Sequence, residues 1–327
     1  MKAKLEDVAR LAGVSPTTVS RTMNNRGYVS EATRMKVQSA MEELNYFPND
    51  LARSLFSKRT HLIGLILPTT ANPFFAELTF HIENLCAAQG LKVLLCNSLN
   101  QIDKEEQYAE MLIRNQVDGI IVGTHNRGIS NYKKANLAVV AIDRYLSGTI
   151  PVVSSDNYEG GKLATQRLID RGCKHILHFN GPAELETPAQ LRRKAFEDLM
   201  QAHGLPHHTY ELELPLDRDH QLSVIRRAFD EHPEVDGVFA SNDMIAASVI
   251  YEAGVRHMSI PDDLKVIGYD GTTIVSSLMP QLTTICQPIE DIARTAIEVL
   301  LREIEGEFDE IAHQTILPVH IRDGSTA

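Results

Sequence analysis

Several common sequence features are missing from this 327-residue chain, and each absence narrows its possible chemistry. There is no tryptophan. The four cysteines are spread singly without a CxxC pair, so neither a disulfide framework nor a structural zinc site is indicated. No Gly-rich dinucleotide loop, P-loop, GxSxG or HExxH motif occurs. We therefore expect neither enzyme activity nor a metal or cofactor.

Long apolar runs are also missing. None approaches the roughly 18 residues of a membrane span, and the N-terminal MKAKLEDVARLAG carries charge throughout, unlike a secretory signal. We therefore expect a cytoplasmic protein without a membrane partner. With 43% hydrophobic residues, the chain is long enough for two or three globular domains.

Charge is distributed unevenly along the chain. Residues 1–60 hold ten Lys or Arg against six Asp or Glu, a balance of +4, whereas the remainder has a balance of −15. A basic segment ahead of an acidic body favours a polyanion partner at one end. A solvated helical face is the simpler explanation of such a mild excess.

The basic segment has the pattern of three short helices. Apolar spacing over Leu5–Leu11 predicts a helix that Gly13 ends, and Ser15 and Pro16 then begin a second helix through Asn24. Ser30 caps a third helix to about Leu44, with Met35, Val37, Ala40, Met41 and Leu44 expected to close a core. Two helices joined by a three-residue turn predict a helix-turn-helix, whose second helix lies in the major groove of DNA.

The strings DVARLAGVSPTTVSRTMNN and VSEATRMKVQSAMEELNYFPNDLARSL resemble the DNA-binding headpiece of the LacI/GalR family of bacterial transcription regulators. The resemblance implies a headpiece at 1–47 and a homodimer on double-stranded, palindromic operator DNA at the nucleoid. Pro16, Thr17 and Arg21 would face the bases, with Arg21 suited to guanine and Pro16 contributing shape only. A phosphate contact is the alternative for Arg21. Further implied phosphate contacts are Ser15, Thr18, Ser20, Asn24 and Arg34.

Residues 48–60 form the junction between the basic segment and the body. Pro48 and the apolar Leu51, Ala52 and Leu55 predict a short helix, too short to be stable alone in water. The resemblance implies a hinge helix that enters the minor groove, with Asn49 and Ala52 against DNA and Leu55 wedged between base pairs. An ordinary linker is the alternative.

The body, residues 61–327, alternates β-branched strand runs with helical segments in two successive series. This alternation predicts an α/β fold with two parallel sheets covered by helices, and a ligand site at the strands' carboxyl ends. It resembles the two-lobed, type I periplasmic-binding-protein-like core of the same family. We expect lobe one at about 61–157 and 288–317, and lobe two at about 158–287 and 318–327.

Single polar residues follow several of the predicted strands. Asp143, Asn242 and Asp270 each stand at a strand end, and only Asp143 has an obvious local partner, in Arg144. The family resemblance adds the other positions of an effector site. The implied effector-binding residues are Asn72, Phe74, Asp143, Arg192, Asn242, Asp270 and Gln287. Arg192 is assigned from LRRKAF, where neighbouring Arg193 leaves the register open, and a helix N-terminus with core phenylalanines is the alternative for ANPFF.

Within the family, the strings VDGIIVGTHN, SSDNYEGGKLAT and HFNGP look most like sucrose operon repressors. Two carboxylates suit a neutral sugar, whereas Arg192, Arg193 and Lys194 would suit a phosphorylated one, so the effector stays open. A corepressor-dependent regulator and a sugar-binding transport protein are the alternatives in function. Because the chain ends soon after a strand at Ile321 without a heptad tail, we expect a dimer and not a tetramer.

Overall fold

The computed structural model describes residues 3–24, 27–47, 59–124, 126, 129, 132, 137–185, 187–212, 218–307 and 312–327. The chain divides into two compact units, Met1–Thr60 and His61–Ala327. Each unit has a hydrophobic core of its own. None of the described helices is both long enough and apolar enough to cross a membrane.

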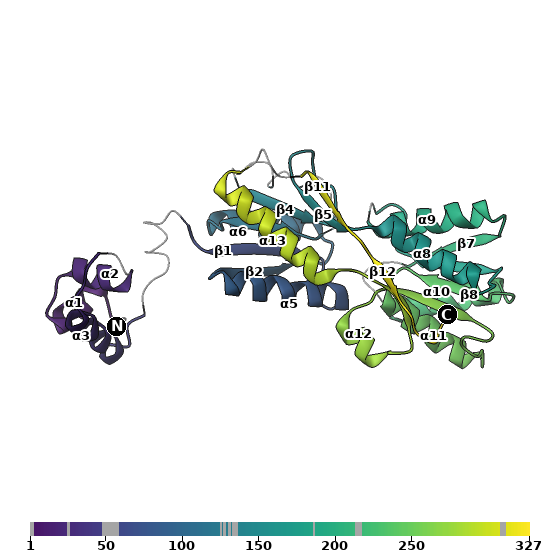
Figure 1. Cartoon of the computed structure of the whole chain (residues 1–327), viewed down its shortest axis with the longest axis horizontal. Coiled ribbons are helices and arrows are strands. Elements are labelled where there is room, and N and C mark those ends of the chain that lie inside the picture. Colours follow the sequence, from purple (N-terminus) through teal and green to yellow (C-terminus); the bar gives the residue numbers. More distant parts are fainter. Residues whose placement is uncertain are drawn as a thin grey trace. The chain divides into compact units, whose positions relative to one another are not determined.

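In its described residues, the first unit forms the helices α1 (Leu5–Ala12), α2 (Pro16–Met23) and α3 (Glu31–Glu43) (Figure 1). Gly13 ends α1 with a left-handed φ of 66°, which a residue without a Cβ adopts at little cost. The side chain of Ser15 then caps α2 by accepting a hydrogen bond from the Thr18 N–H, and Ser30 caps α3 through the Thr33 N–H. The predicted helix-turn-helix is therefore present.

Val8, Val19 and Val37 are fully buried where the three helices of the first unit meet. Met35 was expected in this core, but its side chain is 63% exposed. The reason is helical geometry, because two residues at about 100° each place Met35 roughly opposite Val37 on α3. The core is completed from both ends of the unit by partly buried Leu5 and Tyr46.

In the second unit, the first lobe is a six-stranded parallel sheet of order β11-β5-β4-β3-β1-β2. Helices α5 and α13 pack together on one face, and α6 covers the other. The strands are β1 (Leu62–Leu67), β2 (Lys92–Asn97), β3 (Gly119–Val122), β4 (Ala138–Ile142), β5 (Val152–Ser155) and β11 (Gln314–Leu317). The helices are α5 (Pro73–Ala88), α6 (Ile102–Arg114) and α13 (Ile289–Glu305).

The second lobe repeats this plan with the order β12-β10-β9-β8-β6-β7, in which only β12 runs antiparallel to its neighbour. Its strands are β6 (Ile176–Asn180), β7 (His207–Glu211), β8 (Gly237–Ala240), β9 (Lys265–Asp270), β10 (Thr283–Cys286) and β12 (His320–Arg322). The helices α8 (Asn157–Asp170) and α9 (Ala189–Ala202) cover one face of the sheet. The helices α10 (Arg218–Glu231) and α11 (Asp243–Val255) cover the other face, and the short α12 (Thr273–Leu278) follows β9.

The chain crosses between the two lobes three times, as Figure 1 shows. The crossings lie between β5 and α8, between β10 and α13, and between β11 and β12. They are tied together by hydrogen bonds, since Ser155 Oγ donates to Gln287 Oε1 at 2.6 Å and the Asp156 N–H donates to the Leu317 carbonyl at 2.8 Å. A change in the angle between the lobes would therefore act directly on these hydrogen bonds.

Four elements differ from the sequence expectations. The sequence predicts a strand near Tyr210–Leu214 and a surface loop at His207 and His208, but β7 starts at His207, so both histidines lie in an edge strand. Strand β10 was not expected, since its TTIC sequence is short and half polar, although all four residues are buried. Strand β5 was not expected because its VVSS sequence is short and half polar, although all four residues are buried. Helix α12 was also not expected, because its six residues are too few to show a periodic pattern.

Candidate effector site and DNA-facing helix

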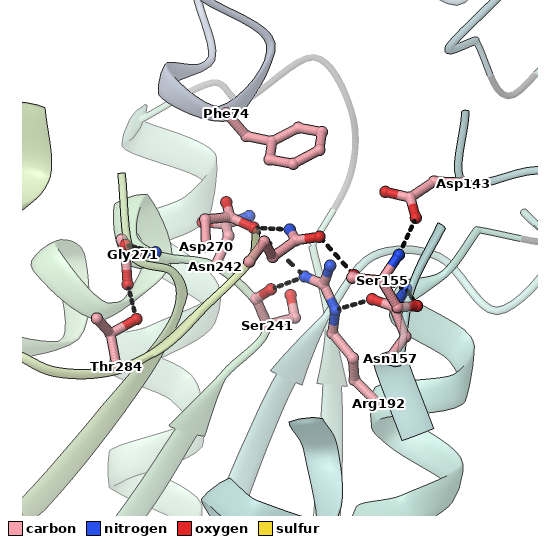
Figure 2. A network of polar contacts seen from close by, with 12 residues as sticks. Phe74, Asp143, Ser155, Asn157, Arg192, Ser241, Asn242, Asp270, Gly271 and Thr284 are labelled. Atoms are coloured by element: carbon pink, nitrogen blue, oxygen red, sulfur yellow. Dashed lines mark hydrogen bonds and ion pairs between the residues drawn. The ribbon is translucent and has the colours of Figure 1, made fainter. Parts of the chain in front are cut away.

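A polar network lies where the carboxyl ends of strands from both lobes meet (Figure 2). Asp143 directly follows β4 of the first lobe, and Asp270 is the last residue of β9 in the second. Gln287 directly follows β10 at the second crossing between the lobes. The structure therefore brings together residues that are far apart in the sequence.

Arg192 occupies the centre of the network and is buried. Its Nε donates to Asn157 Oδ1 at 2.8 Å, and its Nη1 donates to the Ser241 carbonyl at 2.6 Å. The guanidinium lies 3.5 Å from the centre of the Tyr269 ring, which is a cation–π arrangement. These contacts fix Arg192 from several sides.

A chain of hydrogen bonds joins the two carboxylates. Gln287 Nε2 donates to Asp270 Oδ1 at 2.7 Å, and Gln287 Oε1 accepts from the Ser155 hydroxyl. The Ser155 N–H in turn donates to Asp143 Oδ1 at 3.3 Å. Ser155 and Gln287, which lie at two of the crossings, therefore link Asp143 of the first lobe to Asp270 of the second.

Burial raises the pKa of both carboxyl groups, and the nearby Arg192 opposes this effect without cancelling it. The pKa of Asp143 is raised to about 6, and that of Asp270 to about 7. For Asp270, the neighbouring carboxylate of Asp243 raises the pKa further. Perturbed carboxyl groups gathered at strand ends are a physical mark of a binding site.

The backbone at the two carboxylates is in a conformation that is uncommon for residues other than glycine. The φ of Asp143 is 58° and that of Asp270 is 105°. The following turn is held by Asp243, whose carboxylate accepts the Gly271 N–H at 2.8 Å and the Thr284 hydroxyl at 2.5 Å. A Cβ on Gly271 would lie 2.8 Å from Cα of Cys286, so this position requires glycine. Such local strain, kept in place by its surroundings, is typical of functional sites.

The remaining site candidates have local structural roles as well. Asn242 was thought to lack a local explanation, but its side chain caps α11 by accepting the Ile245 N–H. Asn72 caps α5 in the same way through the Phe74 N–H. Phe74 is 5% exposed and packs in the core of the first lobe, while Figure 2 shows its ring turned toward the polar network. The helix N-terminus with a core phenylalanine is therefore present, and the effector role of Asn72 and Phe74 stays a prediction.

The register of the arginine pair is resolved by the structure. Arg193, adjacent to Arg192, binds Glu197 at 2.7 Å and Glu211 at 2.9 Å. Lys194 binds Asp198 at 2.9 Å. Of these three cations, the network described above contains Arg192.

The candidate DNA-contacting residues in the described headpiece lie on α2 and its two caps, and Arg34 lies on α3. Ser15, Pro16, Thr17 and Arg21 are exposed, whereas Thr18, Ser20, Asn24 and Arg34 are half-buried. Ser15 and Thr18 also bond each other through their hydroxyls at 2.9 Å. Asn49, Ala52 and Leu55, the candidates in the expected hinge helix, lie outside the described residues.

Sequence reasoning missed four residues of the network, namely Ser155, Asn157, Ser241 and Tyr269. Ser155 and Asn157 flank the end of the unexpected strand β5, so the signal was hidden with the strand. Ser241 contributes its backbone carbonyl, and because every residue has one, the sequence gives no sign of this contact. Tyr269 stands beside Asp270 in a strand expected at Leu264–Tyr269, and its buried ring lies in the core of the second lobe.

Two family models match the chain. Residues 4–49 match the model described as bacterial regulatory proteins, lacI family, and residues 165–326 match a periplasmic binding protein-like domain. The sucrose operon repressor of Pediococcus pentosaceus is 44% identical over 327 residues, covering 100% of both chains. The ribose operon repressor of Bacillus subtilis is 41% identical and covers 93% of each.

Solved structures agree with the fold. The lac repressor dimer bound to operator and the anti-inducer ONPF has a TM-score of 0.87 at 24% identity, covering 100% of this chain and 99% of that one. A regulator from Alkaliphilus metalliredigens in complex with D-xylulofuranose has a TM-score of 0.74 at 34% identity, covering 82% and 99%.

The helix-turn-helix unit and the two-lobed core together define a bacterial transcription regulator. The chain belongs to the LacI family, and it is a DNA-binding repressor of a sugar operon. Family membership also places it among regulators and not among enzymes.

Proposed function

We propose that this protein represses a sucrose utilisation operon and leaves its operator when a sugar binds between the two lobes. The observation that carries the proposal is the network of Asp143, Arg192 and Asp270, which offers hydrogen-bond acceptors and donors at the carboxyl ends of strands from both lobes. Identity of 44% to sucrose operon repressors over the whole chain supports the choice of operon. Such a repressor acts in the cytoplasm, on the nucleoid.

On the DNA side, we assign base reading to Thr17 and Arg21, whose side chains are exposed on α2. Pro16 shapes the same surface but has no N–H to donate. Ser15, Thr18, Ser20, Asn24 and Arg34 contact phosphates in this proposal, and Asn49, Ala52 and Leu55 contact the minor groove through the hinge segment. Phosphate contacts position the headpiece, and base contacts select the operator.

On the effector side, we assign sugar contacts to Asp143, Arg192, Asn242 and Asp270, with Asn72 and Phe74 approaching from the first lobe. The Phe74 ring supplies an apolar surface for a sugar ring, as the side chains of a sugar site require. Gln287 holds Asp270, so it acts on the sugar through that carboxylate.

The protein works as a homodimer in this proposal. Phe80 on α5 and Leu278 on α12 are 63% and 75% exposed, one on each lobe. Glu77, one turn before Phe80, accepts hydrogen bonds from the N–H and hydroxyl of Thr273 on α12, so the two exposed side chains lie on joined elements. A second copy of the chain is the partner that we assign to this face, in line with the dimeric lac repressor structure.

The test is operator release by a panel of sugars. Full-length protein is bound to its operator in a gel-shift assay, and sucrose, fructose, glucose and ribose are added in turn. We expect sucrose or its fructose moiety to release the DNA, because effectors act by favouring the DNA-incompetent state. Release by ribose alone would replace the sucrose assignment, and tighter DNA binding with sugar would reverse the sign of the regulation.

A further inference from the structure

The charge at the effector site decides between an uncharged and a phosphorylated sugar. The positive charge of Arg192 interacts with the carboxyl groups of both Asp143 and Asp270. Its Nη1 lies 3.7 Å from Asp270 Oδ1. The carboxylate of Asp243 also acts on Asp270 and raises its pKa further. Two carboxyl groups, those of Asp143 and Asp270, thus interact with this arginine, and a third interacts with Asp270.

Arg192 is already engaged by partners within the site. Its Nε and Nη1 donate to Asn157 and to the Ser241 carbonyl, and one face of the guanidinium is against Tyr269. Its Nη1 also lies 3.7 Å from Asp270 Oδ1. A guanidinium has five N–H groups, so donors remain on Nη1 and Nη2, but a phosphate bound to them competes with Asp270 for the same cation.

The neighbouring cations are engaged elsewhere. Arg193 and Lys194, the next two residues on α9, bind Glu197, Glu211 and Asp198. Arg144, which follows Asp143, is buried and donates to the Thr124 carbonyl at 3.1 Å. The positive charges that the sequence places close to the site are therefore held by partners within the protein.

We propose that the effector is an uncharged sugar whose hydroxyl groups donate to Asp143 and Asp270, and that the phosphorylated form of the same sugar is rejected. This inference rests on the proposed function. A phosphate monoester carries close to two negative charges at pH 7. At pH 8, where Asp143 and Asp270 are both largely ionised, these charges are repelled by two carboxylates in a poorly solvated site. Sugar hydroxyls, in contrast, donate to carboxylates through strong charge-assisted hydrogen bonds.

The two carboxylates come from different lobes, so a sugar that donates to both bridges them. Ser155 sets their relative position, because its N–H binds Asp143 and its hydroxyl binds the Gln287 that holds Asp270. A sugar bound to both carboxylates is thereby linked, through Ser155 and Gln287, to the crossings between the lobes. It needs only hydroxyl groups for these contacts.

The experiment is isothermal titration of the full-length dimer with sucrose, fructose, sucrose 6-phosphate, fructose 1-phosphate and fructose 6-phosphate. We expect the uncharged sugar to bind at least roughly a hundredfold more tightly than its phosphate esters. Equal or tighter binding of a phosphate ester would overturn the charge inference and leave the sugar-responsive function standing. Binding of none of the five, together with intact operator binding, would overturn the proposed effector as well.

Charge-removing variants make the test specific. Asp143→Asn and Asp270→Asn each remove one negative charge with little change in shape, and we expect each to reduce the preference for the uncharged sugar by about tenfold or more. The matched control is Asp262→Asn, which removes an exposed carboxylate before the amino end of β9 in the second lobe and should leave the preference unchanged. Two positions are used so that one misfolded variant does not decide the outcome, and operator binding confirms folding of each. An unchanged preference in both folded variants would contradict the proposal.

Discussion

At the residue scale, Asp270 is the group whose chemistry the surrounding structure alters most clearly. Burial raises its pKa to about 7, Arg192 opposes the rise, and Asp243 and Asp143 add to it. A carboxyl group near half-ionisation at neutral pH is sensitive to whatever binds it. A ligand that donates hydrogen bonds stabilises the charged form.

Effector affinity should therefore depend on pH. Sugar hydroxyls bind the ionised carboxylates better, so affinity falls as the pH is lowered from 8 to 5.5, by up to roughly tenfold per unit for each carboxylate that has to ionise. The charged and titratable groups facing Asp270 are Arg192, Asp143 and Asp243. Titration calorimetry at several pH values measures the effect. Asp270→Asn should flatten the profile between pH 6 and 8, and an equally steep profile in that variant would contradict the assignment.

The same groups predict how stability changes with pH when sugar is absent. Asp143, Asp243 and Asp270 have pKa values in the fold above the 3.8 of an ordinary aspartate, so the folded state binds more protons than the unfolded state between about pH 4 and 7. Protonation favours the fold, and this contribution is lost as the pH rises through 6 to 7. Thermal unfolding at pH 5.5 and 7.5 measures this effect, and these three groups should make the fold more stable at pH 5.5 than at pH 7.5.

At the scale of elements, α2 combines a buried side with an exposed one. Val19 fixes the helix in the headpiece core, and Ser15 begins it, leaving Thr17 and Arg21 exposed. The helix thus owes its stability to one set of residues and its proposed recognition to another. The two roles should separate on mutation.

Arg21→Ala should weaken specific operator binding by about 1–3 kcal/mol, or roughly tenfold to a hundredfold, because a bidentate contact to guanine is lost. Headpiece stability should stay within about 0.5 kcal/mol, since Arg21 is exposed. Fluorescence anisotropy with operator and with scrambled DNA separates specific from general binding. Arg10→Ala, which removes an equal charge from the neighbouring α1, is the matched control. Equal losses on both DNAs would identify Arg21 as a phosphate contact.

The elements also show how far the sequence alone could lead. The continuous apolar run LIGLIL predicts a strand at Leu62–Leu67, and β1 has these bounds, because a strand buried on both faces has few alternatives. Strand β7, with the sequence HHTYE, was displaced by three residues, since an exposed edge strand lacks that signal. Asp143, Arg192 and Asp270 were identified, but Ser155 and the Ser241 carbonyl act through positions that only the folded chain creates.

At the scale of the whole molecule, the proposed dimer face joins the two lobes. Phe80 and Leu278 are exposed on elements that the Glu77–Thr273 hydrogen bonds connect. A contact that includes both lobes responds to their relative movement. The partner copy is therefore placed to sense an effector bound between them.

Phe80→Asp and Leu278→Asp should each convert the dimer to a monomer and weaken operator binding at least tenfold, because a buried charge opposes association. Sedimentation velocity measures the assembly state. Ile316→Lys, at a 53% exposed apolar position on β11, is the control and should remain dimeric. Dimers in both aspartate variants, with thermal unfolding unchanged, would place the interface on another surface.

The three crossings of the chain have a consequence for how the protein is synthesised. Strand β11 completes the edge of the first sheet, and β12 completes that of the second, yet both are translated after residue 313. Neither lobe has its full sheet until residues 314–322 have been synthesised, whereas the headpiece is complete within the first 60 residues. A chain cut short before Gln314 would lose a strand from each lobe at once and still carry an intact helix-turn-helix. The order of the sequence thus completes the helix-turn-helix before the core that is proposed to regulate it.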